Sequence, residues 1–150
     1  MPCVFSTSIK NIYIIMKALK SLLLVTLIMV GFLSCKSEGN IPVGVYQLPE
    51  NENFDVNAAP GHLVIVDFNA VWCGPCVRFA PTFEKAAEKY KGQVEFVSVD
   101  VDKHKKLAEE LQIMSIPALL FISPDGTKNW QIGFLTEDEF DKTIQQYLNK

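Results

Sequence analysis

The segment LVIVDF, residues 63–68, limits most strongly what this chain can fold into. It is almost continuously apolar, and such runs are typical of central strands that are covered on both faces. Two cysteines, Cys73 and Cys76, follow it closely. The next segment, residues 76–91, spaces its apolar side chains for one face of a helix. We therefore expect a buried strand that leads through a cysteine-containing turn into a helix.

The rest of the pattern alternates strands with helices and then closes with a hairpin and a helix. We expect strands at residues 43–48, 94–99, 118–122 and 128–132, helices at residues 102–111 and 136–148, and a short helix or loop at residues 50–57. Asp102 can cap the first of these helices, and Thr136 with Glu139 forms a capping box for the last. This order predicts one α/β domain, residues 43–150, whose mixed central β-sheet is flanked by helices on both faces.

Composition narrows the class of protein further. Of the 150 residues, 49% are hydrophobic, a share too high for a disordered chain. The net charge of −3 argues against a nucleic-acid partner, because phosphate binding needs a clustered basic surface. Several phenylalanines are better explained as core residues than as a cofactor site: Phe68, Phe79, Phe83, Phe96, Phe121 and Phe140.

The first 35 residues have the pattern of a targeting segment. They contain lysines but no acidic residue, and from Met16 onward two lysines precede an apolar run at residues 22–33. That run is shorter than the ~20 residues of a membrane-spanning helix and matches a secretory signal. We expect translation to begin at Met16, residues 1–35 to be an N-terminal extension with a signal, and residues 36–42 to be a tether. The domain would then be exported to the periplasmic side of a bacterial membrane.

Cys35 stands at the end of this signal. The sequence Phe32-Leu33-Ser34-Cys35 resembles a bacterial lipobox, although its leucine is one place closer to the cysteine than usual. We therefore expect a lipid on Cys35 that anchors the protein to the membrane. A cleaved signal without lipid and a retained signal anchor are the alternatives.

The cysteine pair predicts redox chemistry. Two cysteines separated by two residues at a helix start can close a small disulfide ring, and the free N–H groups there stabilise a thiolate. We expect Cys73 to be the exposed nucleophile and Cys76 to be shielded by the helix and to resolve mixed disulfides. A zinc site is the alternative, but zinc needs four ligands, and His62 and His104 stand alone in polar segments, as expected of solvated surface residues. We expect no metal.

Asp67 is an acid in an otherwise apolar strand. Alternation along the strand puts it on the same face as Ile65 and Asn69, which should point into the core. Burial raises the pKa of a carboxyl group, and such an acid beneath Cys76 could accept the thiol proton. The alternative is an acid at a strand end that reaches water or a backbone donor.

At this point the residues show a resemblance to a known family. The stretch VIVDFNAVWCGPC, the later Ser115-Ile116-Pro117 and Gly133 resemble thioredoxins, and the similarity covers about residues 43–150. It implies the thioredoxin fold, a redox disulfide between Cys73 and Cys76, a catalytic Asp67, a cis Pro117 and no dissociable cofactor. It also implies a substrate-binding surface made of Trp72, Gly74, Pro75, Ile116, Pro117 and Gly133.

Two positions depart from that family. Thioredoxins usually have tryptophan at the place of Asn69, and a lysine near the buried acid where this chain has Ser98. Without a nearby lysine charge, Asp67 should be harder to ionise here.

These features together predict a monomeric, extracytoplasmic reductase of disulfides in exported proteins. The Gly74-Pro75 spacer favours a reducing member, and a membrane thiol donor would have to return electrons to the cysteine pair. One alternative is a disulfide oxidase or isomerase in an oxidising compartment. Another is a redox-silent module that binds peptides between Trp72 and Ile116-Pro117.

Overall fold

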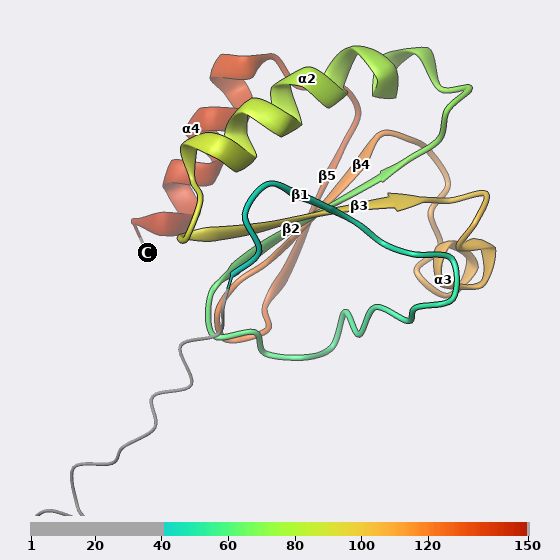
Figure 1. Ribbon diagram of the computed structural model, residues 1–150, viewed down its shortest axis with the longest axis horizontal. Coiled ribbons are helices and arrows are strands. Elements are labelled where there is room, and N and C mark those ends of the chain that lie inside the picture. Colours follow the sequence, from blue (N-terminus) through green and yellow to red (C-terminus); the bar gives the residue numbers. More distant parts are fainter. Residues whose placement is uncertain (1–40, 150) are drawn as a thin grey trace, which may run out of the picture. The chain divides into compact units, whose positions relative to one another are not determined.

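The computed structural model describes residues 41–149, and the predictions for residues 1–35 and most of the tether therefore lie outside the described part. The elements are β1 (Val45–Gln47), β2 (Leu63–Asn69), α2 (Gly74–Lys89), β3 (Val94–Asp100), α3 (Lys105–Glu110), β4 (Ala118–Ile122), β5 (Lys128–Ile132) and α4 (Glu137–Leu148). The strands form one sheet in the order β1-β3-β2-β4-β5 (Figure 1).

The sheet is mixed, as the sequence predicts. β1 and β2 both run parallel to β3, whereas β4 is antiparallel to β2 and β5 is antiparallel to β4. α2 and α4 lie together on one face of the sheet, and α3 lies on the other (Figure 1). This is the thioredoxin fold expected from the sequence.

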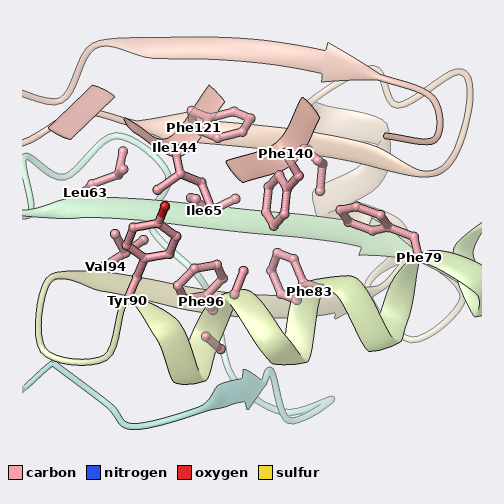
Figure 2. Close-up of a cluster of buried hydrophobic side chains, with 13 residues drawn as sticks. Leu63, Ile65, Phe79, Phe83, Tyr90, Val94, Phe96, Phe121, Phe140 and Ile144 are labelled. Carbon is pink, nitrogen blue, oxygen red and sulfur yellow. The ribbon is translucent and has the colours of Figure 1, made fainter. Parts of the chain in front are cut away.

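Alternation along β2 divides the core between the two faces. Leu63 and Ile65 pack with the aromatic side chains of α2 and α4, as Figure 2 shows. Val66 and Phe68 pack on the opposite face together with Leu107 of α3. The phenylalanines predicted for the core are all buried, at 2% exposure or less. Each contributes about 1.5–3 kcal/mol by leaving water, so the sheet that carries the cysteine loop is firmly held.

The capping box predicted for the last helix, α4, is present in the structure. The Thr136 side chain accepts a hydrogen bond from the Glu139 backbone N–H, and the Glu139 side chain accepts one from the Thr136 N–H at 2.9 Å. Both capping-box contacts satisfy N–H groups that a helix start leaves unpaired.

The segment at residues 50–57, predicted as a short helix or loop, is a loop with turns; one turn closes when the Asn57 N–H donates to the Asp55 side chain at 2.9 Å. Two predicted elements differ from the structure. β1 has only three residues. α3 begins at Lys105, not directly after Asp102, because the Lys103 and His104 N–H groups bond the carbonyl of Asp100 in a preceding turn.

The prediction that His104 is a solvated surface residue is wrong. Its exposure is only 7%, and its ring Nε2 lies 3.1 Å from the carbonyl oxygen of Leu48. The turn before α3 directs this ring beneath the segment that follows β1. Within residues 41–149, no helix has both the length and the apolar character needed to cross a membrane.

Candidate active site

Cys73 and Cys76 form a disulfide in the turn between β2 and α2. Their Cα atoms are 5.3 Å apart. Cys73 is the N-cap of α2, and its sulfur accepts a hydrogen bond from the Cys76 backbone N–H at 3.2 Å. Pro75 occupies the first turn of the helix, where an N–H group is not needed. The helix start therefore directs an N–H donor and its positive dipole end at the Cys73 sulfur.

The expected difference in exposure between the two cysteines is not seen. Both residues are 4% exposed in the disulfide form, and they cluster with Ala70 against Val101 and Ile116. In the disulfide form both cysteines pack against the same neighbours. Exposure of the oxidised pair thus does not distinguish a nucleophile from a resolving cysteine, and the difference between them that the structure shows is the N–H bond to the Cys73 sulfur.

Trp72 lies on the rim of this site. It is 68% exposed, and its indole Nε1 donates a 2.7 Å hydrogen bond to Oδ2 of Asp102. A groove of about 610 Å³ runs from Trp72 past Val101 to Met114 and Ile116. Asp102 is the hydrogen-bond partner of Trp72 and not the helix cap predicted from the sequence, because the N-cap of α3 is His104.

The loop before β4 faces the cysteines. The peptide bond between Ile116 and Pro117 is cis, as the resemblance implies. The Pro117 carbonyl accepts a hydrogen bond from the Gly133 N–H at 2.9 Å, and Gly133 has a φ of +95° that favours glycine. These contacts hold the Ile116-Pro117 backbone beside the disulfide, where the partly buried Ile116 packs against the cysteine cluster.

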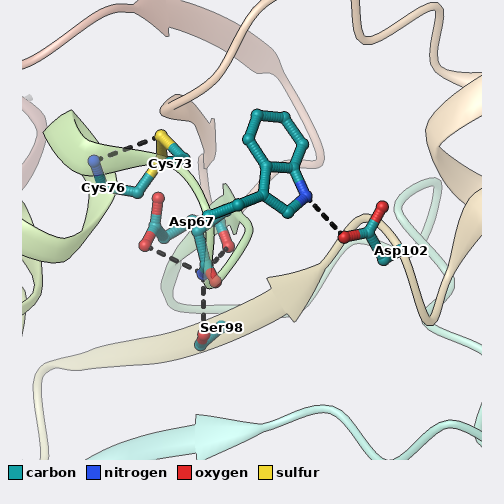
Figure 3. Close-up of a disulfide and its surroundings, with 7 residues drawn as sticks. Asp67, Cys73, Cys76, Ser98 and Asp102 are labelled. Atoms are coloured by element: carbon teal, nitrogen blue, oxygen red, sulfur yellow. Dashed lines mark hydrogen bonds between the residues drawn. A yellow bond between two sulfur atoms is a disulfide. The ribbon is translucent and has the colours of Figure 1, made fainter.

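Asp67 lies behind the disulfide and is only 4% exposed (Figure 3). Its Oδ2 accepts a 3.1 Å hydrogen bond from the Asn69 side-chain amide, whereas its buried Oδ1 has no partner. Burial raises the pKa of Asp67 to about 7, and the amide of Asn69 lowers that pKa in part. The predicted desolvated acid is confirmed, and its bonded side-chain oxygen is held by a side chain, not by a backbone donor.

Asp67 and Cys76 line the same pocket, which has a volume of about 200 Å³. A carboxyl whose pKa is near neutrality, in a residue that lines one pocket with Cys76, can exchange a proton with the Cys76 thiol of the reduced protein directly or through water.

The hydrogen bonds from Asn69 to Asp67 and Ser98 were not predicted from the sequence. The Asn69 amide nitrogen is 2.9 Å from Oγ of Ser98 as well as 3.1 Å from Oδ2 of Asp67. Asp67 and Ser98 are direct neighbours in the parallel pairing of β2 with β3. The strand alternation places Asn69 on the side of Asp67, but only the register brings Ser98 there.

The histidines take no part in the site. His62 is partly buried and its Nε2 lies 2.8 Å from Oε2 of Glu95, so it is paired and not simply solvated. In the part of the chain that the structure describes, no three histidine, cysteine, aspartate or glutamate side chains gather as a metal-binding group.

Comparison with known proteins agrees with this geometry. The family model described as Thioredoxin matches residues 45–146. The thioredoxin of Borreliella burgdorferi is 41% identical over 84 residues, which cover 56% of this chain and 72% of that relative. The thioredoxin of Staphylococcus saprophyticus is 34% identical over 98 residues, covering 65% of this chain and 93% of its own.

Solved structures show the same similarity. Chloroplastic thioredoxin z superimposes with a TM-score of 0.65 at 29% identity, covering 73% of this chain and 98% of that one. The thioredoxin NaTrxh of Nicotiana alata gives a TM-score of 0.61 at 29% identity, covering 71% of this chain and 94% of its own.

Proposed function

This chain belongs to the thioredoxin family of thiol-disulfide oxidoreductases, and we propose that it reduces disulfides of exported proteins outside the cytoplasm. The observation that carries the direction of attack is the hydrogen bond from the Cys76 N–H to the Cys73 sulfur at the start of α2. A donor and a helix dipole at this sulfur stabilise its thiolate form, which is the nucleophile in disulfide exchange.

The first step forms a mixed disulfide. The Cys73 thiolate attacks one sulfur of a substrate disulfide; a bond forms between the two sulfurs, and the other substrate sulfur leaves as a thiolate. The substrate segment would lie along the groove between Trp72 and Ile116. Because the Pro117 carbonyl already accepts from Gly133, the backbone of Ile116 would supply the strand-like hydrogen bonds to the substrate.

The second step resolves the mixed disulfide. Asp67 accepts the proton of the Cys76 thiol, and the Cys76 sulfur attacks Cys73 while the second substrate sulfur leaves. Two electrons have then passed from the cysteine pair to the substrate, and the protein is left as the Cys73–Cys76 disulfide seen here. No dissociable cofactor takes part in either step.

The proposed location rests on the sequence of residues 16–35, in which two lysines, an apolar run and Cys35 follow the order of a lipoprotein signal. An exported protein is out of reach of cytosolic reductants, so a membrane thiol donor would return the pair to the reduced form. The Gly74-Pro75 spacer contributes no charge between the cysteines, which supports a reducing rather than an oxidising protein.

A substrate trap in the native host tests this proposal. Cys76→Ala leaves the mixed disulfide unresolved, so partners remain attached to Cys73 and can be identified by mass spectrometry. The matched control is the double variant Cys73→Ala, Cys76→Ala, which should capture none. We expect exported disulfide-containing proteins and one membrane protein with a thiol pair; a trap that holds only cytoplasmic proteins would contradict the proposed location.

The redox state in intact cells distinguishes the alternatives. A reductase keeps its cysteines as thiols and has a potential near the ~−270 mV typical of thioredoxin. An oxidase would instead be found as a stable disulfide with a potential nearer ~−120 mV. A redox-silent binding module would retain its partners unchanged in Cys73→Ser.

A further inference from the structure

The side-chain nitrogen of Asn69 makes three contacts. This atom, Nδ2, lies 3.1 Å from Oδ2 of Asp67, 3.1 Å from the backbone carbonyl of Asp67 and 2.9 Å from Oγ of Ser98. An amide nitrogen has only two hydrogens, so these acceptors share them. These contacts form a bridge from β2 to β3; its acceptors Asp67 and Ser98 are labelled in Figure 3. The amide is thus held from two strands and cannot turn away without losing bonds.

The bridge binds only one of the two carboxyl oxygens of Asp67. Oδ2 is engaged by Asn69, whereas Oδ1 is buried without a partner. A buried oxygen without a hydrogen-bond partner is unusual and costs free energy of folding. A functional role or a bound water explains such an atom. Asp67 and Cys76 share a pocket with room for a few water molecules, at about 200 Å³ against roughly 30 Å³ for each water. The bridge therefore occupies one oxygen of Asp67 and leaves the other without a hydrogen-bond partner.

Among the described residues, those that line the pocket around Asp67 include no cation. The pocket is lined from β1 by Gln47, from β3 by Ser98 and from α2 by Cys76 and Glu84, and β4 places the apolar Leu119 opposite Asp67. The titratable groups of that lining are therefore Cys76 and Glu84, in addition to Asp67 itself. Asn69 consequently supplies the side-chain donor that favours the ionised form of this acid.

We propose that Asn69 is a positioning residue for disulfide exchange: steadied by Ser98, its amide binds Oδ2 of Asp67 and presents Oδ1 to the Cys76 thiol. The proton of Cys76 passes to Oδ1, the Cys76 sulfur bonds to Cys73, and the substrate sulfur leaves as a thiolate. The inference rests on the proposed role of Asp67 as proton acceptor. In this proposal the neutral amide of Asn69 stabilises the ionised form of Asp67, as a nearby cation would otherwise do.

The bridge has a consequence for pH dependence. Asp67 accepts a proton only while ionised, and burial holds its pKa at about 7 even with the amide present. Without the amide, the pKa of Asp67 rises further, and less of the acid is ionised at neutral pH. The resolving step should then need a higher pH, while formation of the mixed disulfide by Cys73 should not.

The test follows both steps in one stopped-flow reaction. Reduced protein is mixed with an excess of the aromatic disulfide 5,5′-dithiobis(2-nitrobenzoate) across pH 5.5–9, where the first thiolate released reports attack by Cys73 and the second reports resolution by Cys76. In Asn69→Ala we expect resolution at pH 7 to slow about three- to tenfold and to recover towards pH 9. The matched control is Asn129→Ala, which removes an exposed amide from β5.

The outcomes separate this inference from the proposed function. If Asp67→Asn leaves the resolving step unchanged, the acceptor role itself fails. If Asp67→Asn slows resolution but Asn69→Ala has the wild-type pH profile, or loses the same factor at every pH, the positioning role is wrong. In the Asp67→Asn background, Asn69→Ala should cause no further shift with pH. Should Asn69→Ala not fold, Ser98→Ala decides, with a smaller shift in the same direction expected and an unshifted profile overturning the proposal.

Discussion

The indole of Trp72 is tied to the carboxylate of Asp102 by a 2.7 Å hydrogen bond. This bond joins the residue before Cys73 to the turn that follows β3. Trp72 is otherwise mostly exposed, so Asp102 is the contact that fixes the direction of the ring along the groove towards Met114.

Asp102→Ala should free the indole and weaken substrate docking. We expect the second-order rate constant for reduction of insulin disulfides to fall about two- to fivefold, since an exposed hydrogen bond to a charged group contributes little more. Asp102→Asn keeps an acceptor oxygen and should recover most of the rate. A loss of kcat without a change in KM would contradict a role in docking.

Asp67→Asn should slow the resolving step far more than the attacking step. An amide of the same shape cannot accept the thiol proton, and loss of a general base typically costs about 10²–10⁴-fold. Single-turnover kinetics at pH 7 measure the two steps separately. Equal slowing of both steps would show that Asp67 acts on the structure of the site and not as a proton acceptor.

The same acid predicts how stability depends on pH. In the folded chain the pKa of Asp67 is about 7, against an ordinary 3.8. Between these pH values the folded state binds more protons than the unfolded state, so the contribution of Asp67 to the free energy of unfolding falls as pH rises. Above about pH 7 the full penalty of the buried charge remains, of the order of 4 kcal/mol.

Oxidised Asp67→Asn should therefore gain stability relative to the wild type as pH rises from 4 to 8. Urea denaturation at several pH values measures this difference, and Asp138→Asn, at an exposed position of α4, is the matched control. A difference between Asp67→Asn and wild type that stays constant from pH 4 to pH 8 would mean that Asp67 ionises as an ordinary surface acid does.

Gly133→Ala should destabilise the fold by about 1–2 kcal/mol. A φ of +95° strains any residue with a Cβ, although space is available for that atom. Gly74→Ala is the control, because its φ is not positive and the added Cβ would meet Arg78 only at an ordinary 3.7 Å. Thermal unfolding of both oxidised variants gives the comparison, and equal stability of the two would argue against backbone strain at Gly133.

Local sequence signals were sufficient to predict much of the fold. The apolar run of β2, the helix periodicity after Cys76 and the capping box at Thr136 each depend on residues that are close in the chain. The hairpin of β4 and β5 also matches its predicted bounds, since a polar turn separates two short strands. Such signals need no knowledge of the tertiary structure.

The parts that were missed depend on contacts between distant segments. Ser98 meets Asn69 only through the register of β3 against β2, and His104 is buried only because the segment after β1 covers it. The equal exposure of the two cysteines follows from Val101 and Ile116, which come from separate loops. None of these relationships is encoded in a local pattern.

Alkylation of the fully reduced protein tests the central claim most directly. Iodoacetamide is applied across pH 4–9, and the modified cysteine is identified by peptide mass spectrometry. If the start of α2 stabilises the Cys73 thiolate, Cys73 reacts first, with a midpoint below the ~8.5 of a free cysteine, while Cys76 reacts slowly. A Cys73 that stays inert after full reduction, or two cysteines protected together by a bound metal ion, would contradict the account.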